Sequence, residues 1–292
     1  MARAAFLMDS LMHQLGLDGK AFINLLLGYG CNIPPVMGTR ILSNRYNRVV
    51  TMLLIPFTLC SARLQVFVFL AAILFPPAIA PWVVFALYIG SFIAVFGMGL
   101  LLKTLRIAGK PEPFIMEIPP YRLPAINSVA LRSWQELKDF LYQAATLIVA
   151  GVVAVWLLTH FPADMPSASA ETWAGQLGQL FSPVFTPLGI HWQETVALLF
   201  GFIAKEVVIG ALAVIYGGAD LKIQIAAHIT PLQGLSFMLF TLLYTPCIAT
   251  IAAIRAESRS WRIMMLSLAL GLGSAWIASF LLYQAGLLMG YK

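Results

Sequence analysis

The chain has 292 residues, of which 60% are hydrophobic and 10% are charged, and its formal net charge is +6 at pH 7. This composition excludes an ordinary soluble domain, because too few polar residues are present to cover one. The basic residues fall in a few short loops, which is typical of the cytoplasmic loops of membrane proteins and does not favour nucleic-acid binding. The sequence therefore predicts a protein that crosses a membrane several times.

Residues 1–19 predict an amphipathic connecting helix, with Phe6, Leu7, Leu11 and Leu15 along one side. These residues lack the pattern of a secretory signal peptide, and we expect none here. A connecting helix is an unusual start for a complete membrane protein, so we expect the chain to be a fragment of a longer one.

Five apolar segments are long enough to cross a bilayer, which takes roughly 20 residues. They are Val49–Phe75, Ala80–Leu102, Phe140–Phe161, Ile229–Ile254 and Ile263–Leu288. The first contains Pro56 and Arg63, and the fourth contains Pro246. Since proline ends or kinks a helix, we expect these two spans to be broken.

Two further apolar segments are poor spans, because Gly28–Gly30 and Pro34–Pro35 interrupt Ala21–Leu42, and Lys205 with Glu206 interrupts Thr195–Tyr216. The basic loops predict which segment ends face the cytoplasm. That orientation is consistent only if both segments turn back as re-entrant hairpins, one from each side. Such backbone is tolerated where protein or a cavity covers it.

Each hairpin precedes a broken span, and Leu25–Tyr29 is similar to Leu198–Phe202. A hairpin and a broken span entered from opposite sides predict an inverted repeat, with a transport site near the membrane midplane. The fold class is therefore an all-α polytopic membrane protein with about five full spans and two hairpins. The expected divisions are 1–19, the connecting helix; 20–75, the first repeat; 76–189, two spans with a cytoplasmic and an outer loop; 190–254, the second repeat; and 255–292, the last span.

Three cysteines, Cys31, Cys60 and Cys247, lie close to these helix breaks. Their odd number and the absence of a C-x-x-C pair do not favour a disulfide framework. Thiolates prefer soft or borderline metals, and Asn32, threonine hydroxyls and carbonyl groups at the breaks would add oxygen ligands. Such a site suits Fe(II), and would also suit Zn(II), Mn(II) or Co(II). The alternative is that each cysteine is a small buried hydrophobe.

Charged residues within the apolar segments are functional candidates. Arg63 follows Cys60 by three residues on a helix, where it would either lower the pKa of the thiol, pair with a carboxylate, or extend to the surface. Glu206 is the favoured metal-binding or coupling residue, beside Lys205; the alternative is a structural pair that pins the hairpin. The candidate gate positions are Lys205, Arg63, Gly30, Pro34 and Pro246.

Six stretches of the chain resemble the membrane domain of the FeoB-type bacterial ferrous-iron transporter family. They are Met1–Phe6, Gly28–Arg40, Pro56–Leu64, Pro113–Pro124, Ala204–Gly210 and Thr245–Ala249. The resemblance implies two "Gate" repeats that carry Fe(II) across the bacterial inner membrane. It implies that Cys31, Cys60 and Cys247 line the metal path and that Glu206 is an acidic gate residue. The chain departs from the family pattern at Leu59 and Ser61.

No Walker A motif is present, so we expect no nucleotide binding and no enzymatic activity in this chain. The resemblance implies a GTP-binding domain, normally in the same polypeptide, and small accessory proteins. The lipid bilayer, Fe(II) and further copies of the chain complete the expected partners. Two alternatives stay open: a Gate-type transporter of a nucleoside or other small solute, which the few amide side chains (Asn32, Asn127, Gln143) do not favour, and a non-transporting membrane fragment.

Overall fold

The computed structural model describes residues 2–42, 44–105, 125–161, 171–216 and 221–290, and within these ranges all regular secondary structure is helical. The first helices are α1 (Ala2–Gln14), α2 (Gly19–Gly28), α3 (Ile33–Gly38), η1 (Thr39–Ile41), α4 (Arg45–Leu54), η2 (Ile55–Phe57), α5 (Ser61–Leu74) and α6 (Ala80–Thr104). They are followed by α7 (Ile126–His160), α8 (Trp173–Phe185), η3 (Thr186–Leu188), α9 (Trp192–Ile203), α10 (Val207–Tyr216), α11 (Leu221–His228), α12 (Pro231–Leu243), α13 (Ile248–Ser258) and α14 (Trp261–Leu288). The Pro113–Pro124 motif lies outside the described residues.

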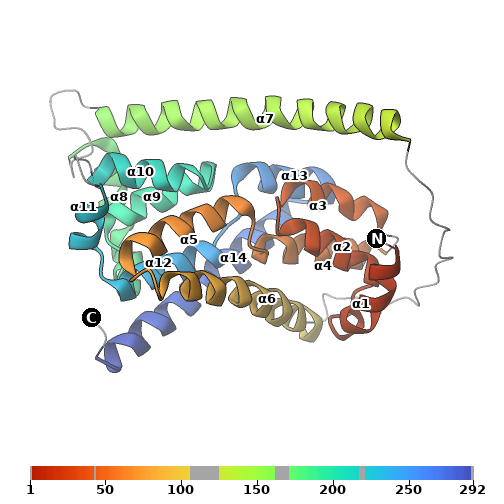
Figure 1. Cartoon of the computed structure of the whole chain (residues 1–292), viewed down its shortest axis with the longest axis horizontal. Helices are drawn as coiled ribbons and strands as arrows, with labels where there is room; N and C mark the ends of the chain where they lie inside the picture. Colours follow the sequence, from red (N-terminus) through yellow and green to blue (C-terminus); the bar gives the residue numbers. More distant parts are fainter. Residues whose placement is uncertain (1, 43, 106–124, 162–170, 217–220, 291–292) are drawn as a thin grey trace.

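Four helical segments are long and apolar enough to cross a membrane: Arg45–Leu74, Ala80–Thr104, Pro231–Ser258 and Trp261–Leu288. They coincide with four of the five expected spans. The fifth expected span, Phe140–Phe161, forms the second half of the long helix α7, which runs along one edge of the molecule (Figure 1). The bent pair of α10 and α11 would bring the number of candidate spans to five.

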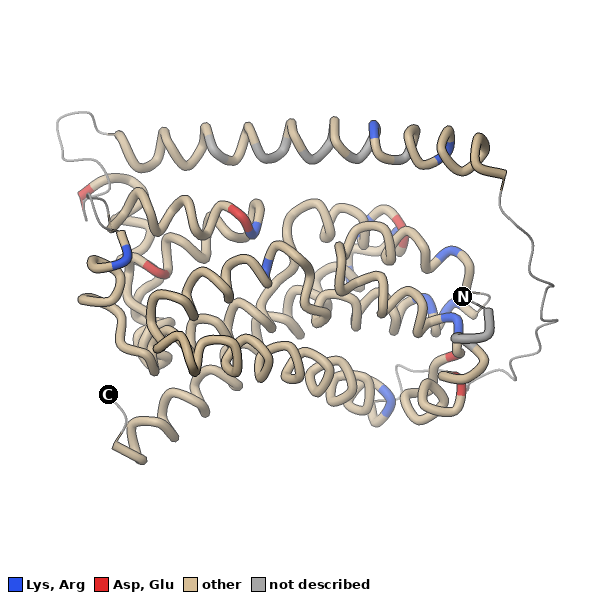
Figure 2. The backbone as a smooth tube through the Cα atoms, viewed as in Figure 1, with Lys and Arg blue, Asp and Glu red and all other residues tan. Residues whose placement is uncertain are grey.

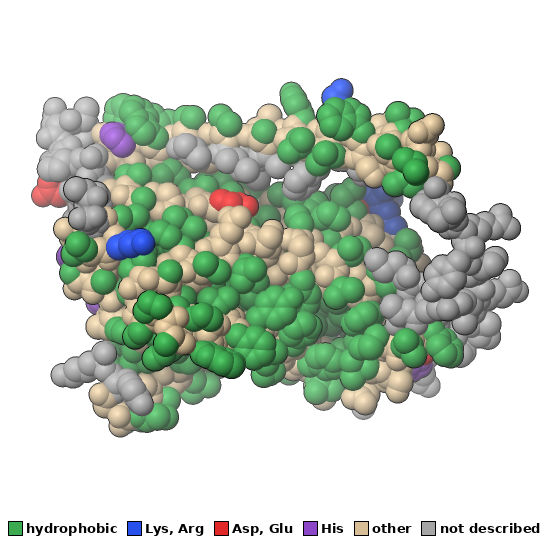
Figure 3. Space-filling view, in the orientation of Figure 1, with side chains coloured by type: hydrophobic (Ala, Val, Ile, Leu, Met, Phe, Trp, Pro, Cys, Tyr) green, Lys and Arg blue, Asp and Glu red, His purple; other side chains and the backbone are tan. Residues whose placement is uncertain are grey.

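The outer surface of the helical body has the character that a bilayer requires. On α6, Trp82 is 70% exposed and Ile93 is 67% exposed. The face drawn in Figure 3 is mostly hydrophobic over α5 and α6. Most charged residues lie toward the ends of the helices, with a few in the middle of the body (Figure 2). These features support a multi-pass membrane protein.

Only the end of α1 and the residue that follows it pack as the sequence predicts. Met12, in the last turns of α1, is 2% exposed and Leu15, just after it, is fully buried, whereas Phe6 is 60% exposed and Leu7 is 76% exposed. The carboxylate of Asp9 accepts a hydrogen bond of 2.8 Å from the Gly19 N–H at the start of α2. This bond holds the end of α1 against α2 and leaves its beginning outside the core.

The two expected hairpins and two broken spans are present in the expected order. The hairpins are α2 with α3, and α9 with α10; in each the two helices pack against each other. The first broken span runs from α4 through η2 to α5, and the second runs from α12 to α13. The first hairpin lies very close to the first break: a Cβ atom built on Gly28 would be 2.4 Å from Thr58 Oγ1. A larger residue in place of Gly28 would therefore separate them.

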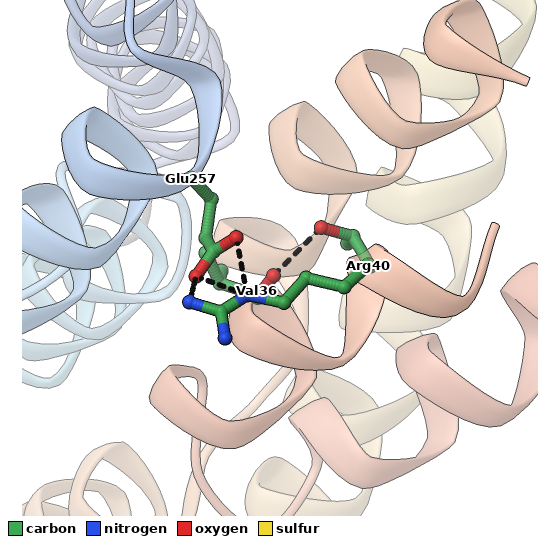
Figure 4. Close-up of polar contacts among 4 residues, drawn as sticks. Val36, Arg40 and Glu257 are labelled. Atoms are coloured by element: carbon green, nitrogen blue, oxygen red, sulfur yellow. Dashed lines mark hydrogen bonds and ion pairs between the residues drawn. The ribbon is translucent and has the colours of Figure 1, made fainter. Parts of the chain in front are cut away.

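One ion pair joins η1 to α13 at an end of the helices (Figure 4). Arg40, in η1 after α3, donates from Nε to both carboxylate oxygens of Glu257 in α13, at 2.9 and 2.8 Å. Its Nη2 also pairs with Glu257. The Glu257 side chain is only 6% exposed, whereas that of Arg40 is 65% exposed. The Glu257 carboxylate therefore depends on the ion pair more than the Arg40 guanidinium does, because the carboxylate has less access to water.

We expect Arg40→Gln to lower the melting temperature of the chain in detergent, because the Glu257 carboxylate, which is largely shielded from water, loses its counter-charge. Glu257→Gln should lower it less. The double variant should be less destabilised than the sum of the single changes, as expected for interacting residues. Arg45→Gln is the matched control, because Arg45 is exposed in the same basic segment and forms no ion pair with the described residues. Strict additivity of the two changes would contradict the coupling.

Candidate functional site

Two of the three cysteines occupy equivalent positions at the start of a helix. Cys60 is the residue before α5 and Cys247 is the residue before α13, and both have an extended backbone. Cys31 lies two residues before α3. All three thiols are free and partly exposed. The positive end of a helix dipole stabilises a thiolate, so Cys60 and Cys247 are placed where a metal-binding thiolate would be favoured.

The helix breaks converge on one region of the molecule. Cys31 lies within electrostatic range of Cys60, Cys247 and Glu206, although these residues come from four separate segments. No three His, Cys, Asp or Glu side chains among the described residues are arranged to hold a metal ion. The fold therefore brings the predicted residues near one another without assembling them into a coordination site.

The tip of the first hairpin is tied to the first broken span. The backbone N–H and the hydroxyl of Ser61 both donate to the Gly30 carbonyl, at 3.1 and 3.0 Å. The Thr58 hydroxyl lies 3.1 Å from the Asn32 amide oxygen. Ser61, one of the two departures from the family pattern, thus forms a specific contact. Pro34 occupies the first turn of α3, where its missing N–H costs no helical bond.

Arg63 is fully buried and connects the two broken spans. Its Nη1 donates to the Pro56 carbonyl at 2.6 Å and to the Thr58 carbonyl at 3.2 Å. Its Nη2 donates to the Tyr244 carbonyl at 2.9 Å. Arg63 forms no carboxylate pair among the described residues, and it does not extend to the surface. Its observed partners are carbonyl groups that the helix breaks leave without intrahelical donors.

Lys205 is 3% exposed and lies at the break of the second hairpin. Its ammonium donates to the Thr245 carbonyl at 2.7 Å and lies 3.2 Å from the centroid of the Tyr244 ring. The neighbouring Glu206 is exposed. The adjacent residues therefore point in different directions, with the cation turned inward.

The second break contains Pro246 and Cys247. Proline has no N–H, so this break has one backbone donor fewer. The Cys247 thiol lies 3.2 Å from the Thr250 hydroxyl, one turn into α13. This contact orients the sulfur along the start of the helix.

Sequence reasoning named carbonyls and threonine hydroxyls at the breaks in general but did not single out Thr58, Tyr244 and Thr245. A signal was available, since Thr58-Leu59-Cys60 and Thr245-Pro246-Cys247 share a Thr-x-Cys pattern at equivalent breaks. In both copies the threonine carbonyl accepts a hydrogen bond from a buried cationic side chain. The pattern marks the same structural position, just before the helix that follows the break, in the two broken spans.

A hollow of about 240 Å³ between α7, α8 and α9 lies apart from the cysteines. It is lined by apolar side chains such as Leu158, Leu177 and Phe200. An apolar lining offers no hydrogen bonds to a nucleobase or a sugar, so this hollow does not favour a nucleoside site.

Comparison with known proteins assigns the chain to a family. The model of the Gate family, described as nucleoside recognition, matches residues 1–75 and 141–261, and the model of the ferrous iron transport protein B C terminus matches residues 84–135. The chain is 44% identical to an Fe(2+) transporter FeoB of Synechocystis, over 100% of this chain and 48% of that protein. It is 38% identical to an Fe(2+) transporter FeoB of Staphylococcus aureus, over 98% of this chain and 44% of that protein.

A third relative, a fusion of Fe(2+) transport protein A and FeoB from Porphyromonas gingivalis, is 35% identical over 99% of this chain and 40% of that protein. The chain thus spans about half the length of these relatives or somewhat less. No solved structure matches it.

We expect Arg63→Met to destabilise the chain strongly, because it leaves three interior carbonyl groups without donors. Each unpaired group costs roughly 1–3 kcal/mol. Arg63→Lys should recover only part of the loss, since an ammonium lacks the planar fork that reaches both spans. Thermal unfolding in detergent measures both, with Arg45→Gln as the control. A melting temperature for Arg63→Met equal to that of the control would contradict this role of Arg63.

Proposed function

This chain belongs to the Gate-containing, FeoB-type family of ferrous-iron transporters, and on that premise we propose that it forms the path by which Fe(II) crosses the bacterial inner membrane. The observation that carries the proposal is the convergence of Cys31, Cys60 and Cys247 with Glu206 at the helix breaks. We propose that the two repeats, 20–75 and 190–254, form opposite walls of this path.

The breaks supply two kinds of ligand. Cys60 and Cys247 stand at helix N-termini, where the dipole stabilises thiolates. The carbonyls of Tyr244 and Thr245 stand just beyond the C-terminus of α12, where the dipole attracts cations. Fe(II) is a borderline metal that accepts both sulfur and oxygen ligands. Asn32 adds a further buried oxygen beside the first break.

The coordination site would form by small movements of the hairpins. Cys31 lies within electrostatic range of Cys60 and Cys247, and Arg63 and Lys205 donate hydrogen bonds to carbonyl oxygens at the breaks. Gly30, Pro34 and Pro246 lie in the segments that would move, which suits the role of gate positions. Zn(II), Mn(II) and Co(II) would compete for the same ligands.

We infer the other parts of the transport system from the greater length of the relatives. We propose that a GTP-binding domain and small accessory proteins act with this chain, and that copies of the chain associate. The basic segments that include Arg40, Arg45, Arg255 and Arg259 would face the cytoplasm. The description of the Gate family makes nucleoside transport the second candidate function.

We expect the purified chain in detergent, without oxygen, to bind Co(II) with a sulfur-to-metal charge-transfer band. Cys31→Ser, Cys60→Ser and Cys247→Ser should each weaken the band and slow Fe(II) uptake by proteoliposomes, because each removes one thiolate. Ser128→Ala is the control, since Ser128 is an exposed serine on α7, a helix that carries none of the three cysteines.

A wild-type chain without the band would contradict thiolate coordination. Uptake of a radiolabelled nucleoside by the same proteoliposomes, with no uptake of Fe(II), would favour the second candidate instead.

We expect Glu206→Gln to raise the Fe(II) concentration needed for half-maximal uptake more than it lowers the maximal rate. Glu206 is exposed at the tip of the second hairpin, so its charge would attract the ion to the path before the ion binds the thiols. Glu171→Gln, at another exposed carboxylate, is the matched control. A fall in maximal rate alone would place Glu206 in a later step.

A further inference from the structure

The surroundings of the Lys205 ammonium are built to receive a cation. The group lies 2.7 Å from the Thr245 carbonyl oxygen and 3.2 Å from the centroid of the Tyr244 ring. Carbonyl oxygens and the faces of aromatic rings both attract positive charge. Lys205 is 3% exposed and has no ion-pair contact with a carboxylate among the described residues. The partners seen for this buried cation are thus neutral electron donors.

The neighbouring carbonyl, that of Tyr244, also accepts a hydrogen bond from a cationic side chain, which comes from the first broken span. Arg63 Nη2 donates to the Tyr244 carbonyl at 2.9 Å. Two consecutive carbonyl oxygens at the second break, those of Tyr244 and Thr245, are therefore both bonded to side-chain cations. Cys247 follows Thr245 by two residues in the chain and lies within electrostatic range of Lys205. A divalent metal would need these same oxygen and sulfur ligands.

We propose that Lys205 is a built-in competitor of the transported divalent cation, and that ammonium and metal ion occupy the position beside Thr245 O and Tyr244 alternately. This inference rests on the proposed function. The two cations exclude each other because they share ligands and because like charges at short distance repel. Lys205 has a flexible four-carbon chain, so the ammonium can leave without breaking the fold. Arg63 is less suited to this role, since it also binds two carbonyls of its own span.

A purely structural lysine would behave differently from a competitor. A structural tie predicts that removing the ammonium loosens the second break and weakens metal binding. A competitor predicts that removing the positive charge strengthens metal binding, whereas keeping the charge leaves the affinity low. The sign of the affinity change therefore separates the two roles.

The test is calorimetric titration of the full chain in detergent with Co(II), which stands in for Fe(II). We expect Lys205→Met, which keeps the length of the side chain without its charge, to bind Co(II) about tenfold more tightly than the wild type, which corresponds to about 1.4 kcal/mol. Lys205→Arg should bind like the wild type. Lys222→Met is the matched control, since Lys222 is an exposed lysine on α11, and its affinity should not change.

A second neutral variant guards against misfolding. Lys205→Gln keeps an N–H donor that can reach toward the Thr245 carbonyl, so it should also bind more tightly if charge is what excludes the metal. Equal or weaker affinity in a folded Lys205→Gln or Lys205→Met chain, judged by its melting temperature, would overturn this inference alone. Absence of Co(II) binding in the wild type and in every variant would overturn the proposed function as well.

Discussion

Backbone carbonyls that lose their helical partners inside an apolar body must find other donors, and the centre of this structure depends on that constraint. Arg63 and Lys205 supply those donors. A hydroxyl or an amide offers one or two N–H or O–H groups, but a guanidinium offers five in a fixed fork. Arg63 can therefore bond to carbonyls of its own span and, through Tyr244, to a carbonyl of the other span. One side chain holds together two breaks that neither span could stabilise alone.

Arg63 and Lys205 place positive charge in an apolar interior, where burying a charge costs free energy. The carbonyls beyond the C-terminus of α12 carry partial negative charge, which offsets part of that cost. The thiols of Cys60 and Cys247 are near enough to interact with Lys205. The electrostatic surroundings that stabilise the breaks are thus those that a metal cation would meet, so the structural role and the proposed transport role rest on the same atoms.

Much of the fold could be predicted from the sequence, because hydropathy identifies spans and Gly or Pro identifies their breaks. Hydropathy placed the four strongest spans, and the residues around Gly28 and Pro246 located the breaks. The direction of Lys205 and Glu206 was harder to predict, since the two residues are adjacent. The sequence favoured Glu206 over Lys205 as the metal-binding or coupling residue and did not predict which of the two is buried; the structure buries Lys205 and leaves Glu206 exposed. The physical reason is that a broken helix exposes acceptors at its C-terminal end, and these require a donor.

Contacts between distant segments could not be predicted from the sequence, since they depend on how those segments pack. Two of them use arginines of the first half of the chain: Arg40 pairs with Glu257 of α13 at one end, and Arg63 bonds to the Tyr244 carbonyl in the interior. Water can reach Arg40 and screen its ion pair, whereas a hydrogen bond shielded from water is stronger. The interior bond of Arg63 is therefore the stronger of the two contacts, and it contributes more than the Arg40 ion pair to holding the two broken spans together.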